Sequence, residues 1–214
     1  MPDPADRAAF YLCLARAFLP PQKNAYQAVK LHLDDDLAEL ATALGYPAAE
    51  LLGDLRAAVA RVPDYLTLLR TYSGLFLTPP VPVTLNAGRY LDGAVMGRVT
   101  TAIEKCYRQA GLARAGGFHD LPDHIALQLE FVAYLCAAEA DAKTSHMTAD
   151  EFLASFVRYW LPPFTTALEK ACGQDESARI YLYLARLLQV AVDYDLRDYR
   201  AAGSTAATRS ANKP

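Results

Sequence analysis

The stretch DHIALQLEFVAYLCAAEADA, residues 123–142, decides the fold class of this chain. Its apolar residues cover most of the circumference of an α-helix, and a helix of that kind is buried on nearly all sides. It therefore predicts a central helix around which the other elements pack. Polar groups in such a helix cost free energy unless they are paired, so the aspartate, histidine, glutamine and glutamate at its start are candidates for a special role.

The segments on both sides of this helix also have helical spacing of apolar residues. Seven further helices are expected, each bounded or interrupted by a proline, a glycine or a capping residue. They are one ended by Pro20-Pro21, one from about Asn24 to Gly45 that is interrupted or bent near 34–36, one ended near Val62, one opened by Pro63, one closed by Gly111, one from the capping box Thr148–Glu151 to a bend or end at Pro162-Pro163, and one capped by Asp175. No βαβ alternation and no internal repeat is found. The sequence predicts an all-α helical bundle of about eight helices, with residues 1–200 as one domain.

Charge and composition narrow the classes of partner. The chain is 53% hydrophobic with a formal charge of -3, and residues 1–200 carry 19 basic against 24 acidic side chains, a charge of -5. Nucleic-acid-binding proteins normally have the opposite balance, whereas a basic peptide is attracted. The last fourteen residues, 201–214, contain few large apolar side chains, and we expect them to form a disordered tail.

Neither a membrane span nor a metal site is expected. No apolar run reaches the ~18–20 residues that cross a bilayer, and the N-terminus lacks a basic region before an apolar one, so a cytoplasmic protein is expected. The four cysteines are scattered without CxxC pairs or zinc-like spacing, which predicts buried thiols with no disulfide, metal or cofactor.

The stretch LTPPVPVTLNAG, residues 77–88, interrupts the helical pattern. Three prolines within four positions favour an extended course, so this stretch is either a linker or a rigid binding loop. The chain could hinge on either side of the following helix, between two lobes. Long loops would also permit helix exchange, so both a monomer and a helix-exchanged dimer stay open.

Two roles are open for the start of the central helix. Asp120 as N-cap with Asp123 at the third helical position would satisfy free amides at the positive end of the helix dipole. Alternatively, Asp123 and Glu130 lie within ~20° of one another and ~10 Å apart along the helix. That separation is too large for one shared proton or metal, but it suits two cationic groups of one extended ligand.

Enzymatic functions have little support. The adjacent pair His119-Asp120 is reminiscent of helical metal-dependent phosphohydrolases, but such a site needs further ligands, and His32 and His146 lack a matching context. No GxSxG, P-loop or GxGxxG motif is present. A small-ligand-binding or scaffolding domain, with the same residues as caps and core, is a second alternative.

Three stretches together resemble the TorD/DmsD/NarJ family of redox-enzyme maturation chaperones. Residues 120–131, DLPDHIALQLEF, are similar to that family's acidic-x-Pro-Asp-His signature with a glutamate two turns later. Residues 72–80, YSGLFLTPP, resemble its Tyr-x-x-Leu-Phe segment before a proline-rich loop. Residues 156–164, FVRYWLPPF, resemble its basic residue followed by His-Leu-x-Pro-Trp, although Tyr159-Trp160 stands where a histidine is expected. The resemblance covers roughly residues 7–195.

The resemblance implies an all-helical cytoplasmic chaperone with no catalysis of its own. Such chaperones bind the twin-arginine leader, or the apo form, of a molybdenum-cofactor oxidoreductase and delay export until the cofactor is inserted. The family's peptide-binding surface corresponds here to Phe76, Pro79, Pro122, Asp123, His124 and Glu130. Three further residues could line a groove or fill the core: Tyr72, Gln128 and Trp160. This sequence departs from the family pattern in the loop after the second motif and in the third motif, so the identity of the client enzyme stays open.

Overall fold

The computed structural model describes residues 3–113, 120–141, 145–173 and 175–211, and the side chains of residues 24–31 and 198–211 lie outside this description. Regular secondary structure in these ranges is helical, and the all-α class is confirmed. The elements in chain order are α1 (Pro4–Ala17), α2 (Lys23–Ala43), α3 (Ala49–Ala60), α4 (Tyr65–Phe76), α5 (Ala87–Leu91), α6 (Arg98–Gln109), α7 (Ile125–Ala140), α8 (Ala149–Phe152), the π-helical η1 (Leu153–Val157), α9 (Arg158–Cys172) and α10 (Arg179–Ala211).

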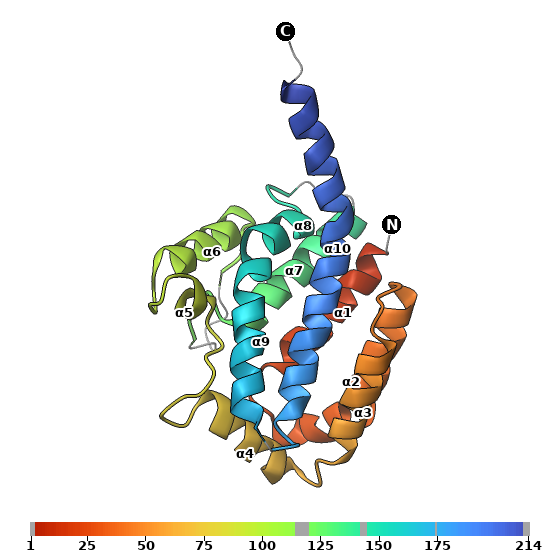
Figure 1. The fold of residues 1–214 in the computed structure, drawn as a ribbon, viewed down its shortest axis with the longest axis vertical. Coiled ribbons are helices and arrows are strands. Elements are labelled where there is room, and N and C mark those ends of the chain that lie inside the picture. The colour runs from red at the N-terminus through yellow and green to blue at the C-terminus, as the bar shows by residue number, and fades with distance from the viewer. Residues whose placement is uncertain (1–2, 114–119, 142–144, 174, 212–214) are drawn as a thin grey trace.

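The central helix of the sequence analysis is α7. Its most extensive packing is against α1, and Leu129, Val132 and Cys136 on it are completely buried. Around this pair, α9 and α10 run side by side along the long axis, α2 and α3 flank α10, and α5 and α6 lie beyond α9 (Figure 1). The prediction of a central helix is confirmed for Ile125–Ala140.

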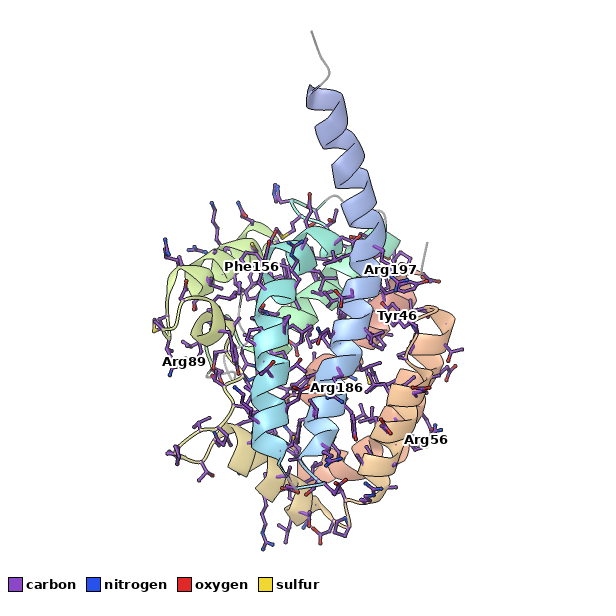
Figure 2. All side chains as sticks on the ribbon, in the orientation of Figure 1. Tyr46, Arg56, Arg89, Phe156, Arg186 and Arg197 are labelled. Carbon is purple, nitrogen blue, oxygen red and sulfur yellow. The ribbon has the colours of Figure 1, made fainter. Side chains whose placement is uncertain are left out.

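The expected break in the second helix is wrong. Residues 34–36 lie inside a continuous α2. The Arg56 side chain, labelled in Figure 2, extends from α3 to pair with Asp34 and Asp35. Opposite charge from the neighbouring helix offsets the mutual repulsion of the acidic run, so the helix continues to Ala43. Gly45 then takes a φ of 70°, as expected for a residue that ends a helix.

The prolines at 162 and 163 do not end or interrupt their helix. The capping box of Thr148 and Glu151 starts α8 as predicted, and the chain continues through η1 into α9, which contains both prolines. A proline inside a helix costs ~3 kcal/mol or more. That cost is offset by burial of the Trp160, Leu161 and Phe164 side chains on either side of the prolines. The π segment directly before α9 is a common way to accommodate altered hydrogen bonding.

Two chain segments differ from their expected form. The proline-rich stretch leads into the short helix α5, where a loop was expected.

At the C-terminal end of the chain, the backbone of α10 is helical to Ala211, where a disordered tail was expected from residue 201. This end of α10 projects beyond the other helices (Figure 1). Extending an existing helix avoids the cost of nucleation, which favours helical backbone in the alanine-rich tail. Residues 212–214 lie outside the described residues, and the division into domain and tail stays a prediction.

Within the described ranges, no helix has the length and apolar character needed to cross a membrane.

Candidate functional site

The Asp123 carboxylate caps a helix other than its own. Its Oδ2 accepts a hydrogen bond of 2.7 Å from the Gly88 backbone N–H, in the first turn of α5, and its Oδ1 accepts from Asn86 Nδ2 at 3.4 Å. The side chain is completely buried. The expectation that this carboxylate is held free for a ligand is therefore not met in this conformation, because groups of the chain itself occupy it.

Backbone hydrogen bonds join the proline-rich stretch to the start of α7. The Ile125 N–H donates to the Leu85 carbonyl at 2.8 Å, and the Ala87 N–H donates to the Asp123 carbonyl at 3.1 Å. An isolated antiparallel bridge pairs Asn86 with His124. These contacts hold residues 85–88 in place, so this end of the stretch is a fixed loop and not a free linker.

His124 is the N-cap residue of α7. Its Nδ1 accepts a hydrogen bond of 3.1 Å from the Ala126 N–H, which requires a neutral imidazole or at least an unprotonated Nδ1. Burial lowers the pKa of His124, opposed by the nearby carboxylates of Asp120 and Asp123. The predicted N-cap role of Asp120 is wrong, because the helix begins later and Asp120 Oδ1 accepts instead from Leu121 N–H at 2.7 Å.

Gln128 links the same segment to the third motif. Its Nε2 donates to the Asp123 carbonyl at 2.7 Å, and its Oε1 accepts from Trp160 Nε1 at 3.0 Å. Both side chains are buried, and their polar atoms are hydrogen-bonded within the chain. Of the two roles considered for Trp160 and Gln128, the structure places both in the core, where they tie α9 to α7.

The predicted peptide-binding residues do not form one exposed surface. Pro79 and Glu130 are exposed, whereas Phe76, Pro122, Asp123 and His124 are buried. Tyr72 is buried too, and its hydroxyl donates to the Phe18 carbonyl at 3.2 Å. Hydrogen bonds join Asp123, Gln128 and Trp160, and Tyr72 packs against Phe76 in a separate aromatic contact, so most of the motif residues form a buried scaffold.

Glu130 connects this scaffold to a second region. Partial burial raises the pKa of Glu130, and the nearby Arg16 opposes that shift. Arg16 lines a groove of about 720 Å³, whose other walls come from α2, α4 and α10. The sequence analysis did not predict this groove. One sequence feature could have indicated it. Leu12 and Cys13 lie outside the apolar stripe of the first helix, which contains Phe10, Leu14 and Phe18, so that helix is apolar on a second face.

No cluster of three or more histidine, cysteine, aspartate or glutamate side chains suited to a metal occurs among the described residues. His119 of the His119-Asp120 pair lies outside those residues. All four cysteines are free thiols, and burial raises the pKa of Cys136 to about 12 and that of Cys13 to about 11, which disfavours their reactive thiolate forms.

Gly88 gives a test of the contact between α5 and Asp123. A Cβ at this position would lie 2.9 Å from Asp123 Oδ2 and 3.1 Å from the Ala94 carbonyl oxygen. We expect Gly88→Ala to lower the free energy of unfolding by about 1–3 kcal/mol through overpacking, measured by urea denaturation. Gly53→Ala, where nothing lies within 4 Å of the added carbon, should instead stabilise its helix by up to about 1 kcal/mol. Equal effects of the two substitutions would contradict the close approach.

Comparisons with known proteins identify a family and a similar fold. Residues 23–166 match a family model described as nitrate reductase delta subunit. The chaperone protein TorD of Shewanella loihica is 28% identical over 192 residues, covering 89% of this chain and 78% of the relative. TorD of Escherichia coli O81 is 28% identical over 96 residues, covering 44% and 46%. A crystal structure of a proposed redox enzyme maturation protein from Archaeoglobus fulgidus is similar in fold, with a TM-score of 0.51 at 22% identity, over 84% of this chain and 89% of that one.

Proposed function

The chain belongs to the nitrate reductase delta subunit family, which includes the TorD- and NarJ-like chaperones, and from this premise we propose that it is a system-specific chaperone of a molybdenum-cofactor oxidoreductase. It binds the twin-arginine leader or the apo form of that enzyme in the cytoplasm and is released after cofactor insertion. It carries out no reaction itself. The observation that carries the proposal is the family match over residues 23–166, which contains the fixed loop and all of α7.

The polar residues of the signature motif support a binding role more than a catalytic one. Hydrogen bonds to the chain's own backbone and to Trp160 engage the side chains of Asp123, His124 and Gln128. A general acid or base must be within reach of a substrate proton, and these groups are buried. In our proposal they form a rigid support, and the leader binds at other, exposed residues of the chain.

Charge favours a cationic segment as the ligand. Residues 1–200 have a net charge of -5, and arginine pairs well with carboxylates because its planar guanidinium donates two parallel hydrogen bonds. A leader with two arginines beside an apolar segment therefore suits a surface that has carboxylates beside apolar side chains.

Titration calorimetry with a model leader peptide tests the proposal. The peptide has two adjacent arginines followed by an apolar segment, and its control has glutamine at both arginine positions. We expect micromolar affinity for the first, about -8 kcal/mol, and at least tenfold weaker binding of the control, with a difference that shrinks at high salt. Absence of binding, or equal affinity for both peptides, would contradict leader recognition.

A helical small-ligand-binding domain is the second candidate, and the groove beside α1 favours it. Its volume of about 720 Å³ is within the usual range for small-molecule sites, ~300–1,000 Å³. A thermal shift with members of a metabolite library and none with the leader peptide would favour this candidate.

A further inference from the structure

The groove beside α1 has a built apolar floor. Leu68, Tyr181 and Leu184 line it from α4 and α10, and all three side chains are buried. Tyr181 packs edge-on against Tyr72 and Phe76. The floor is therefore fixed by aromatic packing against α4.

The walls continue the apolar surface toward the solvent. On the α1 side they include Ala9, Leu12 and Cys13, and on the α2 side they include Leu40. Leu12, Cys13 and Leu40 are only half-buried, so a ligand in the groove would remove further apolar area from water, at ~25 cal/mol per Å². This is the surface expected for an apolar occupant.

The rim of the groove is acidic. Asp36 and Glu39 line it from α2 and are exposed, and no salt bridge joins either of them to a residue whose side chain the structure describes. Among the lining residues whose side chains the structure describes, Arg16 is the one basic residue, against the two carboxylates of Asp36 and Glu39. The described charge of the groove is therefore negative, and a cation can be received there without displacing an existing ion pair.

We propose that this groove, and not the buried signature motif, receives the leader: its apolar segment lies against Leu12, Leu40 and Leu184, and its arginines pair with Asp36 and Glu39. The proposal rests on the proposed function and assigns it a surface. Charge complementarity with the acidic rim favours a cationic occupant, and the apolar walls select the leader over the chain's own tail, which has Arg209 and Lys213 but no large apolar side chain to fill the groove.

A bulky substitution that fills the groove tests its apolar part. Ala9→Trp adds a large side chain at an exposed position of the wall, and Ala57→Trp adds the same side chain at an exposed position of α3 outside the groove. With a fluorescent model leader peptide, we expect anisotropy titrations to show at least tenfold weaker binding for Ala9→Trp and unchanged binding for Ala57→Trp. Circular dichroism checks that both variants are folded.

A charge reversal tests the rim. We expect Glu39→Lys to weaken peptide binding at least fivefold at low salt, and Glu50→Lys, an identical charge change on α3 outside the groove, to have less than a twofold effect. The affinity for the glutamine-substituted peptide should change little with either lysine substitution. Equal effects of the two lysine variants on the arginine peptide would overturn the assignment of the rim.

The outcomes separate the groove from the function. If the wild-type chain binds the peptide and Ala9→Trp matches Ala57→Trp, the groove assignment is overturned and the leader-binding function stands. If the wild-type chain binds no leader peptide, both the groove assignment and the leader-binding function are overturned. If light scattering shows a dimer that Ala9→Trp dissociates, a second copy occupies the groove and the assignment is again overturned.

Discussion

Asp123→Ala is expected to lower the free energy of unfolding by about 3 kcal/mol. The substitution leaves the Gly88 N–H without its acceptor in a buried site, and an unsatisfied buried polar group costs ~1–3 kcal/mol, in addition to the ~1.5–3 kcal/mol of a hydrogen bond to a carboxylate. It also releases α5 from the start of α7, because Asp123 contacts both Asn86 and Gly88. Urea denaturation followed by circular dichroism measures the loss.

Two matched variants control this measurement. Asp123→Asn keeps an acceptor oxygen and should lose less than the alanine variant. Asp120→Ala removes the neighbouring exposed carboxylate and should cost at most about 1 kcal/mol. A fully stable Asp123→Ala variant with no peptide affinity would contradict our interpretation, because it would make Asp123 a recognition residue after all.

Arg7→Met is expected to cost about 3–5 kcal/mol, since it removes one partner from a buried ion pair. The Arg7 guanidinium donates to Asp195 at 3.1 Å and to Asp150 at 2.6 Å, which joins α1 to α10 and α8. The Asp195 carboxylate also accepts hydrogen bonds from Tyr11 and Tyr46. In the variant these two hydrogen bonds remain, but the positive charge that balances Asp195 is lost. Tyr46 is labelled beside α10 in Figure 2.

The loss of free energy of unfolding in Arg7→Met should depend on pH. Burial raises the pKa of Asp195 above the ordinary value of an aspartate, and Arg7 opposes the shift, so removing Arg7 raises the pKa further. A carboxyl whose pKa is higher in the folded state stabilises the fold when protonated, and that contribution is lost as the pH rises through the folded pKa. The variant should therefore lose more stability at pH 7 than at pH 5.

Arg56→Met is the matched control for this pair of predictions. Arg56 is exposed and pairs with Asp34 and Asp35 at the surface, where ion pairs contribute at most about 1 kcal/mol. Equal losses for Arg7→Met and Arg56→Met, at either pH, would contradict a buried clamp between the two ends of the chain.

The helices could be predicted because their signals are local. Apolar spacing, the Thr148 capping box and Gly45 each act within a few residues, and the structure has all three as expected. The wrong predictions at 34–36 and at Pro162-Pro163 share a cause. In both cases a distant partner outweighed the local preference: Arg56 for the aspartates, and core packing of Trp160 and Phe164 for the prolines.

The role of the signature motif could be predicted only in part. The sequence marks Asp123 as a polar residue that needs a partner, but the Gly88 amide is 35 positions away and backbone donors carry no sequence signal. Gln128 and Trp160 are similar, since their hydrogen bond joins residues 32 positions apart. The groove depends on three-dimensional packing of α1, α2, α4 and α10, which periodicity along one helix does not reveal.

Photo-crosslinking tests the central claim most directly. A model leader peptide with a photoreactive group in its apolar segment is irradiated with the wild-type chain, and the attachment sites are mapped by mass spectrometry. We predict attachment to the groove walls, at Ala9, Leu12 or Leu40. Attachment confined to residues 77–92 or to the start of α7 would contradict the account.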